Sequence, residues 1–364
     1  MLAAILARAD ELIRRSFRFG TTAAQRPQVR VWHGERQRVG HLGYAQDDFN
    51  LVGEVDAGGA TVSLTCTVNG NPPRSLTVGA RKDGFGDGRR LARTGHFNAD
   101  IPTAQLREGE NIVVLEARVR RGEPATVTVI VERRSGSSAL PLMLDWTSIT
   151  SVQDAGQCVD GEWAVLDGKL TPVHTGYDRT FLIGNRTWVD YEATVPVTVH
   201  RVDPKTGPNS GGNGLGLLFR FTGHVTGGPR NFPPGQPKWG YQPFGAIAWL
   251  RWADGADRPP AIQFYPGDRD GPTNHGTFAV REGATYLMRA RCESLPDDAS
   301  GAGATRYAFR IWEAGTTEPD DWAWQETQVS RTANRNGGLA LLAHHVSVSF
   351  GTVDVRQLSP GLGT

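Results

Sequence analysis

The sequence lacks the features that define several large classes of protein. It has only three cysteines, Cys66, Cys158 and Cys292, which are far apart and show no CxxC spacing. This pattern excludes a disulfide framework or a zinc ribbon as the basis of the fold, and it predicts buried structural thiols. There is no phosphate-binding glycine loop and no GxSxG or HExxH motif, so no cofactor is identifiable from the sequence.

An excess of charge of one sign is also missing. Lys and Arg total 39 against 38 Asp and Glu, which leaves a net charge of +1. Such a chain has no overall field to attract nucleic acid, and we expect no nucleic-acid partner. No apolar run is long enough to span a bilayer. Arg8, Asp10 and Glu11 interrupt the short apolar run at the N-terminus, so we expect no secretory signal peptide and leave the compartment open.

Only one segment has the apolar spacing of a helix. Residues 2–17 carry Leu2, Ile5, Leu6, Leu12 and Ile13 at that spacing, which predicts a short amphipathic helix within an N-terminal arm, residues 1–27. The helix would dock on its own chain, or it would contact a partner or a membrane surface.

The next hundred residues alternate between apolar and polar side chains. Residues 60–68 alternate cleanly, and Asn69 to Pro73 form a turn by their chemistry. We therefore predict a β-sandwich over residues 28–134 and a linker at 135–139. The sandwich resembles bacterial immunoglobulin-like domains. Its predicted strands are 29–32, 49–55, 60–68, 74–80, 111–119 and 125–134. His41, in a glycine-bearing turn at 40–46, is expected to be a hydrogen-bonded structural group.

The remainder, residues 140–364, predicts a second all-β domain of about ten strands. Gly161 to Val165 with Asp167-Gly168, then Tyr191-Glu192, then Gly214 to Arg220 are similar to successive strands of concanavalin A-like jelly rolls, laminin-G-like members included. The resemblance implies a two-sheet jelly roll, a fold that hosts lectins, hydrolases, lyases and interaction modules. The predicted strands are 161–173, 179–184, 189–200, 214–223, 244–252, 260–266, 285–293, 305–313, 338–345 and 348–358.

Alternation within these strands predicts one cationic, aromatic face. If the strands share a sheet, the face carries Arg220, Trp249, Arg251, Gln263, Tyr265, Arg289, Arg291, Arg310 and Trp312. Aromatic planes stack on sugars, and arginine pairs with carboxylate or sulfate, so the face would suit an acidic glycan. Alternatively, the strands belong to different sheets and the arginines are solvated or paired with acids. The irregular segment 222–244 adds Trp239, Tyr241 and Gln242, either as ligand contacts or as a self-packed flap.

Catalysis has weaker support than binding. The ExDxxE motif of hydrolases with this fold is absent, although Asp190 and Glu192 share a strand face. A uronate lyase would use Arg220 to neutralise the substrate, with Tyr265 and His224 transferring protons. The RxExR and QxH motifs of alginate lyases are not matched, because Tyr265 stands where histidine would be.

Metal binding is also weakly indicated. Adjacent residues of a strand point to opposite faces, so His344 and His345 cannot share a metal site. Structural calcium remains possible, with Asp145 and Asp354 as candidate ligands. The sequence thus predicts a polysaccharide-recognition protein, with a polysaccharide-cleaving enzyme or a protein-interaction module as alternatives. Such a function would suit an extracellular or cell-surface site.

Overall fold

The structure is a computed structural model that describes residues 26–80, 89–207, 210–226, 237–239, 245–253, 257–268 and 271–358. The predicted helix at 2–17, together with Tyr241 and Gln242, lies outside the described residues. Within the described ranges, regular structure consists of β-strands and short 3-10 turns, which confirms the predicted all-β fold class. No helix in this part of the chain is long and apolar enough to cross a membrane.

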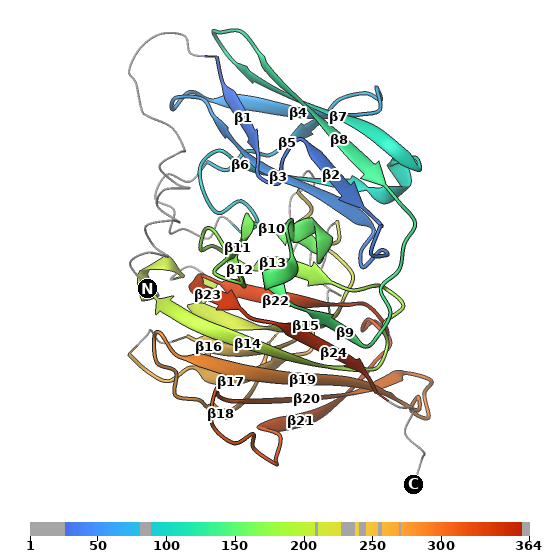
Figure 1. Ribbon diagram of the computed structural model, residues 1–364, viewed down its shortest axis with the longest axis vertical. Helices are drawn as coiled ribbons and strands as arrows, with labels where there is room; N and C mark the ends of the chain where they lie inside the picture. Colours follow the sequence, from blue (N-terminus) through green and yellow to red (C-terminus); the bar gives the residue numbers. More distant parts are fainter. Residues whose placement is uncertain are drawn as a thin grey trace.

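The first sandwich is built from two sheets that enclose an apolar core (Figure 1). Its described strands form a three-stranded sheet of β1 (Gln28–Val31), β3 (Asp48–Asp56) and β6 (His96–Pro102). They also form a five-stranded sheet of β2 (Arg36–Val39), β8 (Ala125–Arg133), β7 (Gly109–Val119), β4 (Val62–Val68) and β5 (Arg74–Leu76). The η1 turn (Thr103–Gln105) follows β6. Its likeness to immunoglobulin domains, and the domain limits, stay predictions.

The second sandwich is larger. Among the described residues, its seven-stranded sheet runs in the order β10 (Gln157–Asp160), β13 (Arg179–Ile183), β22 (Gly338–His344), β15 (Asn213–Phe221), β16 (Ala246–Trp252), β17 (Ala261–Tyr265) and β18 (Thr273–Thr277). The facing nine-stranded sheet contains β11 (Trp163–Leu166), β12 (Lys169–Pro172), β23 (Val346–Phe350), β14 (Tyr191–Val202), β19 (Thr285–Leu295), β20 (Gly303–Glu313), β21 (Trp324–Ser330), β24 (Val353–Gln357) and β9 (Leu142–Leu144). The turns η2 (Trp146–Ser148), η3 (Val152–Asp154) and η4 (Pro204–Thr206) connect strands.

Three strands that the sequence did not predict, β6, β18 and β21, are rich in polar residues. Strand β6 alternates apolar Phe97, Ala99 and Ile101 with polar His96, Asn98 and Asp100, yet all six of these residues are buried. The edge strands β18 and β21 are also rich in polar residues. The alternation of residues 96–102 is therefore visible in the sequence, whereas the burial of their polar side chains at the junction follows only from the tertiary structure.

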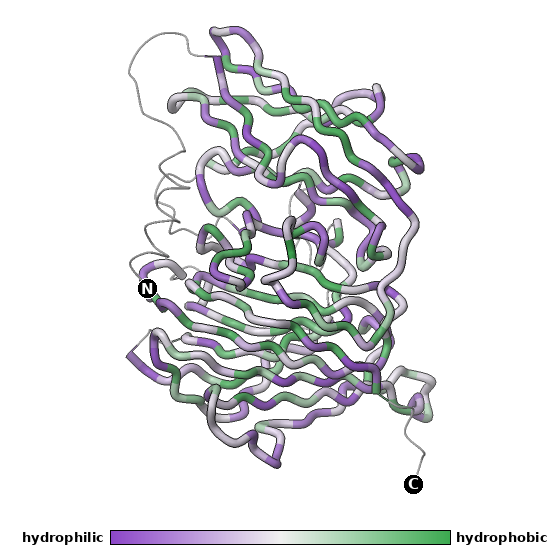
Figure 2. Tube along the Cα trace, viewed as in Figure 1, coloured by the Kyte–Doolittle hydropathy of each residue, from purple (hydrophilic) through white to green (hydrophobic). Residues whose placement is uncertain are grey.

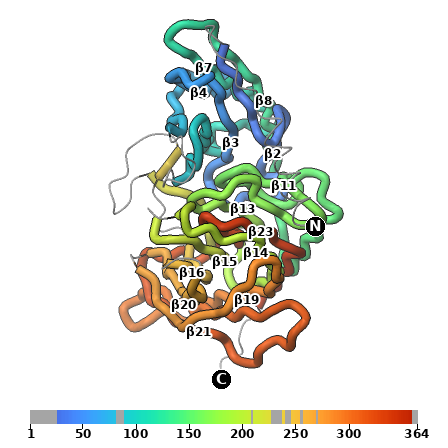
Figure 3. The backbone as a smooth tube through the Cα atoms, turned by 90° about the vertical axis from the view of Figure 1, so that its left-hand side faces the viewer, coloured from blue at the N-terminus to red at the C-terminus, as the bar shows by residue number. Residues whose placement is uncertain are grey.

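The two sandwiches are stacked, and strand β10 of the seven-stranded sheet lies beside β3 of the first sandwich (Figures 1 and 3). Hydrophobic segments run through the interiors of both (Figure 2). Between them, Arg90 donates two hydrogen bonds to Asp100 at 2.8 Å and one to Asp160 on β10 at 2.6 Å. Asn98 also donates to Asp160, at 3.0 Å.

Buried charges at this junction are held in their ionised forms. Burial alone would raise the pKa of Asp160, but Arg90 and His224 bring it well below its ordinary value. Burial opposes the charge on Arg90, and the carboxylates of Asp100 and Asp160 more than compensate, which raises its pKa. Separating the two sandwiches would leave these buried charges unpaired, which is costly.

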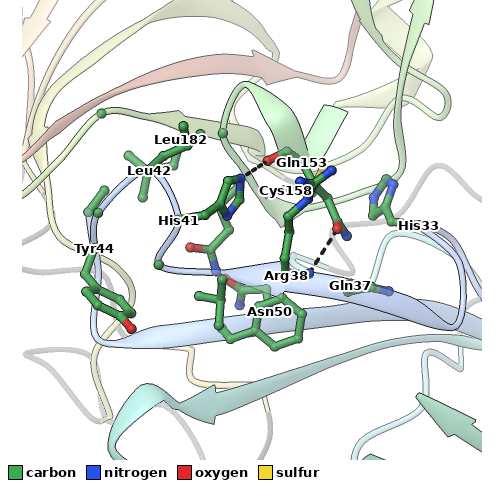
Figure 4. Close-up of a pocket in the computed structure, with 18 residues that line it drawn as sticks. His33, Gln37, Arg38, His41, Leu42, Tyr44, Asn50, Gln153, Cys158 and Leu182 are labelled. Atoms are coloured by element: carbon green, nitrogen blue, oxygen red, sulfur yellow. Dashed lines mark hydrogen bonds between the residues drawn. The ribbon is translucent and has the colours of Figure 1, made fainter. Parts of the chain in front are cut away.

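The turn around His41 and the three cysteines have the conformation and burial that the sequence predicted. Gly40 and Gly43 have φ of 81° and 85°, as the predicted turn requires. His41 Nε2 donates at 2.9 Å to the carbonyl of Gln153, a structural contact across the junction that Figure 4 shows. The cavity beside it has a volume of about 40 Å³, room for a few water molecules and too little for a sugar. Cys66, Cys158 and Cys292 are free and buried, as predicted.

Acidification is expected to loosen the junction through its buried histidines. His96 and His174 lie with ring centroids 5.8 Å apart, and burial lowers the pKa of His174 to about 3 and that of His96 well below its usual range. Below pH about 6.5 the unfolded imidazoles bind protons that the folded ones do not, so the free energy of unfolding decreases as the pH is lowered. The expected loss at pH 5 is about 2 kcal/mol per histidine.

Urea unfolding at pH 7.5 and pH 5 measures this loss. The free energy of unfolding of His174→Asn should differ less between the two pH values than that of the unmodified protein. The variant His275→Asn, away from the junction, should show the same difference as the unmodified protein. An unchanged pH dependence in His174→Asn would contradict the assignment.

Candidate functional site

The outer face of the seven-stranded sheet carries a cleft with a volume of about 320 Å³. Its floor contains apolar side chains from three strands, namely Phe221 and Leu218 of β15, Ile247 of β16 and Leu342 of β22, with Tyr265 of β17 beside them. Alternation places Ile247, Trp249 and Arg251 on this one face of β16, as the sequence predicted. Gln263 and Tyr265 join them because β17 pairs with β16 in the register Trp249↔Gln263 and Ile247↔Tyr265.

Two glycines of β15 allow this arrangement. Gly214 and Gly216 pair with Arg251 and Trp249 across the sheet. A Cβ at Gly216 would lie 2.3 Å from the Cβ of Trp249, and one at Gly214 would lie 2.8 Å from the indole ring. Without side chains at these two positions, the tryptophan and arginine can lie over the neighbouring strand.

The polar side chains of the cleft have unusual surroundings. The Arg251 guanidinium carbon lies 4.6 Å from the Trp249 ring centroid, a cation–π distance. One Arg251 nitrogen, Nη2, donates to the Ser210 carbonyl, while Nη1 is buried and has no hydrogen-bond partner among the described residues. The Trp249 Nε1 and His224 Nδ1 atoms are likewise buried without a partner in the described part of the chain.

Burial also affects charge in the cleft. Desolvation lowers the pKa of Arg251, although Asp178 partly offsets it. His224 hydrogen bonds through Nε2 to Asp160 at 2.8 Å, so the cleft abuts the junction network. Buried donors that lack partners usually face a ligand or water, and here they surround one cleft.

Sequence reasoning missed several residues that line this cleft, among them Asp178, Ser210 and His344. His344 shares the outer face of β22 with Leu342 and Ala340, and its alternation could have been read from residues 338–345. Asp178, with a φ of 40°, and Ser210 belong to connections between strands. Such residues carry no periodic signal, so only the fold brings them together.

Arg220, a candidate for the cationic face and for a lyase, lies inside the second sandwich and not at the cleft. Its side chain is 0% exposed and donates to the Val189 carbonyl, to Thr305 and Ser294 hydroxyls and to Asp190. A register shift between Leu218 and Phe221, with a φ of 50° at Arg220, interrupts the alternation that would have pointed this residue outward. Arg220 therefore ties the two sheets of the second sandwich together from inside.

The predicted single face is also wrong in part, because its strands divide between two sheets. Arg289, Arg310 and Trp312 lie on β19 and β20 of the nine-stranded sheet, far from the cleft in the sheet order. Arg289 and Arg310 both pair with Glu318. Arg291, on the same sheet, pairs with Glu192 at 2.7 Å, so the alternative of arginines paired with acids holds there.

The remaining candidates have structural contacts or lie elsewhere. Trp239 is half-buried and does not line the cleft. Asp145 caps the η2 turn by accepting from Thr147, and Asp354 pairs with Arg356 at 2.7 Å. Within the described ranges, no three or more His, Cys, Asp or Glu side chains gather as a metal site. The two carboxylates proposed for calcium therefore do not form part of such a group.

The chain matches no protein-family model and no curated protein. Among solved structures, it is similar to the Ca²⁺-bound exoplasmic/lumenal domain of VIP36 at a TM-score of 0.37 and 13% identity, over 55% of this chain and 83% of that one. It is similar to alginate lyase vAL-1 from Chlorella virus at 0.36 and 11%, over 60% and 99%. For lectin I-B4 from Griffonia simplicifolia the values are 0.33 and 10%, over 60% and 100%. Similarity at these levels assigns no activity.

Proposed function

We propose that the cleft of the seven-stranded sheet binds carbohydrate, with a preference for glycans that carry an anionic group. The observation that carries this proposal is the Trp249–Arg251 pair, whose indole N–H and Nη1 are buried at the cleft without partners among the described residues. An indole plane packs against the apolar C–H face of a sugar ring, and its N–H reaches a hydroxyl. A guanidinium beside it donates to a carboxylate or sulfate.

The other residues of the cleft support the same ligand class. Tyr265 adds a second aromatic ring, and Gln263 adds an amide that hydrogen bonds to Asn274 at 2.8 Å. A mostly apolar cleft with a few placed polar groups is typical of small-ligand sites. The first sandwich would act as a support, because the Arg90 network joins it to the strand β10 at the end of the same sheet.

Affinity electrophoresis against polygalacturonate, alginate and a neutral β-glucan tests the proposal. We expect Trp249→Ala to weaken binding about 30-fold, since truncation of a central aromatic contact costs about 2 kcal/mol. Arg251→Gln should weaken binding to the acidic polymers about tenfold and leave the neutral polymer nearly unchanged.

Trp312→Ala is the matched control, because Trp312 is as buried as Trp249, at 7% and 8% exposed, and also lies beside an arginine, Arg289. Trp312 belongs to the other sheet, so the affinity of Trp312→Ala for each polymer should equal that of the unmodified protein. Absence of binding to every polymer, or equal weakening by Trp312→Ala and Trp249→Ala, would reject the cleft as a glycan site. Thermal unfolding of each variant confirms that it is folded.

A further inference from the structure

Three side chains at the cleft stand in the order hydroxyl, imidazole, carboxylate. His344 Nε2 lies 3.1 Å from Ser210 Oγ, and His344 Nδ1 lies 2.6 Å from Asp178 Oδ1. All three residues line the cleft. We infer that Ser210, His344 and Asp178 act as nucleophile, base and orienting carboxylate in the hydrolysis of carboxylic esters. That these esters are carried by a glycan rests on the proposed function.

The hydrogen bonds have the direction that this chemistry needs. Burial raises the pKa of Asp178, but His344 and Arg251 bring it below its ordinary value, so the carboxylate is ionised at neutral pH and only accepts. His344 Nδ1 also lies 3.4 Å from the Asp178 backbone nitrogen, but the carboxylate contact is much shorter, at 2.6 Å, so Nδ1 donates to the carboxylate. In the neutral ring Nε2 is then left as an acceptor for the Ser210 hydroxyl. The alternative acceptor for that hydroxyl, the Gly207 carbonyl, lies farther away at 3.3 Å.

The position of the imidazole is fixed by packing. His344 is 2% exposed, and the Tyr177 ring meets it edge-on at a centroid distance of 4.8 Å. Ser210 is only partly buried and lines the cleft. A base held rigidly behind an accessible hydroxyl is the geometry that lowers the cost of proton transfer during attack.

Arg251 supplies a donor for the negative charge that develops on the acyl oxygen. Its Nη2 donates to the Ser210 carbonyl, which places the guanidinium beside the nucleophile. Its Nη1 is buried and has no hydrogen-bond partner among the described residues. A preorganised cation that needs no rearrangement is the kind of group that stabilises an oxyanion.

Other described histidines show only part of this arrangement. His224 and His275 contact the carboxylates of Asp160 and Glu326, and His200 contacts the Ser349 hydroxyl at 3.0 Å. Only at His344 do the described contacts place a serine on one ring nitrogen and a carboxylate on the other. The His200–Ser349 pair, on the nine-stranded sheet, is therefore an internal control for a histidine–serine contact without the carboxylate.

The reaction balances with water as the only co-reactant. Ser210 Oγ forms a bond to the acyl carbon as His344 removes the hydroxyl proton. The bond from that carbon to the alcohol oxygen breaks, and the alcohol leaves with the proton from His344. Water then attacks the acyl-serine and gives a proton to His344, which returns it to Ser210 as the carboxylic acid departs.

Labelling of the full-length protein with a fluorophosphonate, followed by peptide mass spectrometry, tests the nucleophile directly. We expect modification of Ser210 and loss of the label in Ser210→Ala. Hydrolysis of p-nitrophenyl acetate should fall at least about 10³-fold in Ser210→Ala and about 10²-fold or more in Asp178→Asn. Ser349→Ala should keep both the label and the rate.

The inference is overturned if the unmodified protein is not labelled at Ser210, or if Ser210→Ala retains the ester hydrolysis of the Ser349→Ala control. Neither readout depends on glycan binding, so this failure is distinct from failure of the proposed function. Release of acetate from acetylated xylan, or of methanol from methyl-esterified pectin, then identifies which ester the bound glycan carries. Turnover of p-nitrophenyl acetate without binding to any polysaccharide would keep the relay and reject the glycan.

Discussion

Replacement of Arg90 by alanine is expected to lower the free energy of unfolding by about 3–5 kcal/mol, because it removes one partner from a buried charge network. Arg90 is 5% exposed, and its guanidinium pairs with both Asp100 and Asp160. These carboxylates are 2% and 0% exposed, so they would remain ionised or bind protons at a cost. Urea unfolding followed by tryptophan fluorescence measures the loss.

Two variants make this result specific. Arg90→Lys keeps the charge but cannot form the paired contact with Asp100 and reach Asp160 together, so it should recover only part of the stability. Arg36→Ala removes an arginine whose pair with Glu110 is 64% and 60% exposed, and it should have little effect because solvent screens that pair. A loss in Arg90→Ala no greater than in Arg36→Ala would show that the junction does not depend on this network.

Replacement of Arg220 by alanine should also cost about 3–5 kcal/mol, through loss of a buried, fully hydrogen-bonded cation. Its guanidinium joins Asp190 and the Val189 carbonyl, which precede β14, to Thr305 on β20 and Ser294 on β19. Its backbone N–H also donates to the Tyr191 hydroxyl at 2.8 Å. Lysine has one nitrogen and cannot reach these separate acceptors, so Arg220→Lys should be nearly as damaging.

The same variant separates a structural role from a role in binding. At a temperature where Arg220→Lys is folded, its affinity for polysaccharide should equal that of the unmodified protein. Arg251→Gln should show the reverse, with weaker binding and a smaller change in unfolding. Selective loss of binding in Arg220→Lys, without loss of stability, would restore Arg220 to the ligand site.

Much of the fold follows from local patterns in the sequence. Alternation over residues 62–68 defines a strand with one buried face, because successive side chains of a strand point to opposite sides, and the same period of two applies to residues 246–252. That alternation alone placed Trp249 and Arg251 on one face. Few, widely separated cysteines and balanced charge excluded whole classes of protein without any structure.

The tertiary structure decided which faces meet. Alternation says nothing about which sheet a strand joins, so Arg289, Arg310 and Trp312 were placed with residues of the opposite sheet. A single irregularity near Arg220 redirected that side chain into the interior. Asp178, Ser210 and His344 come from distant parts of the chain, and two of them lie between strands, where no period constrains the sequence. Long-range strand pairing alone brings their atoms within hydrogen-bonding distance.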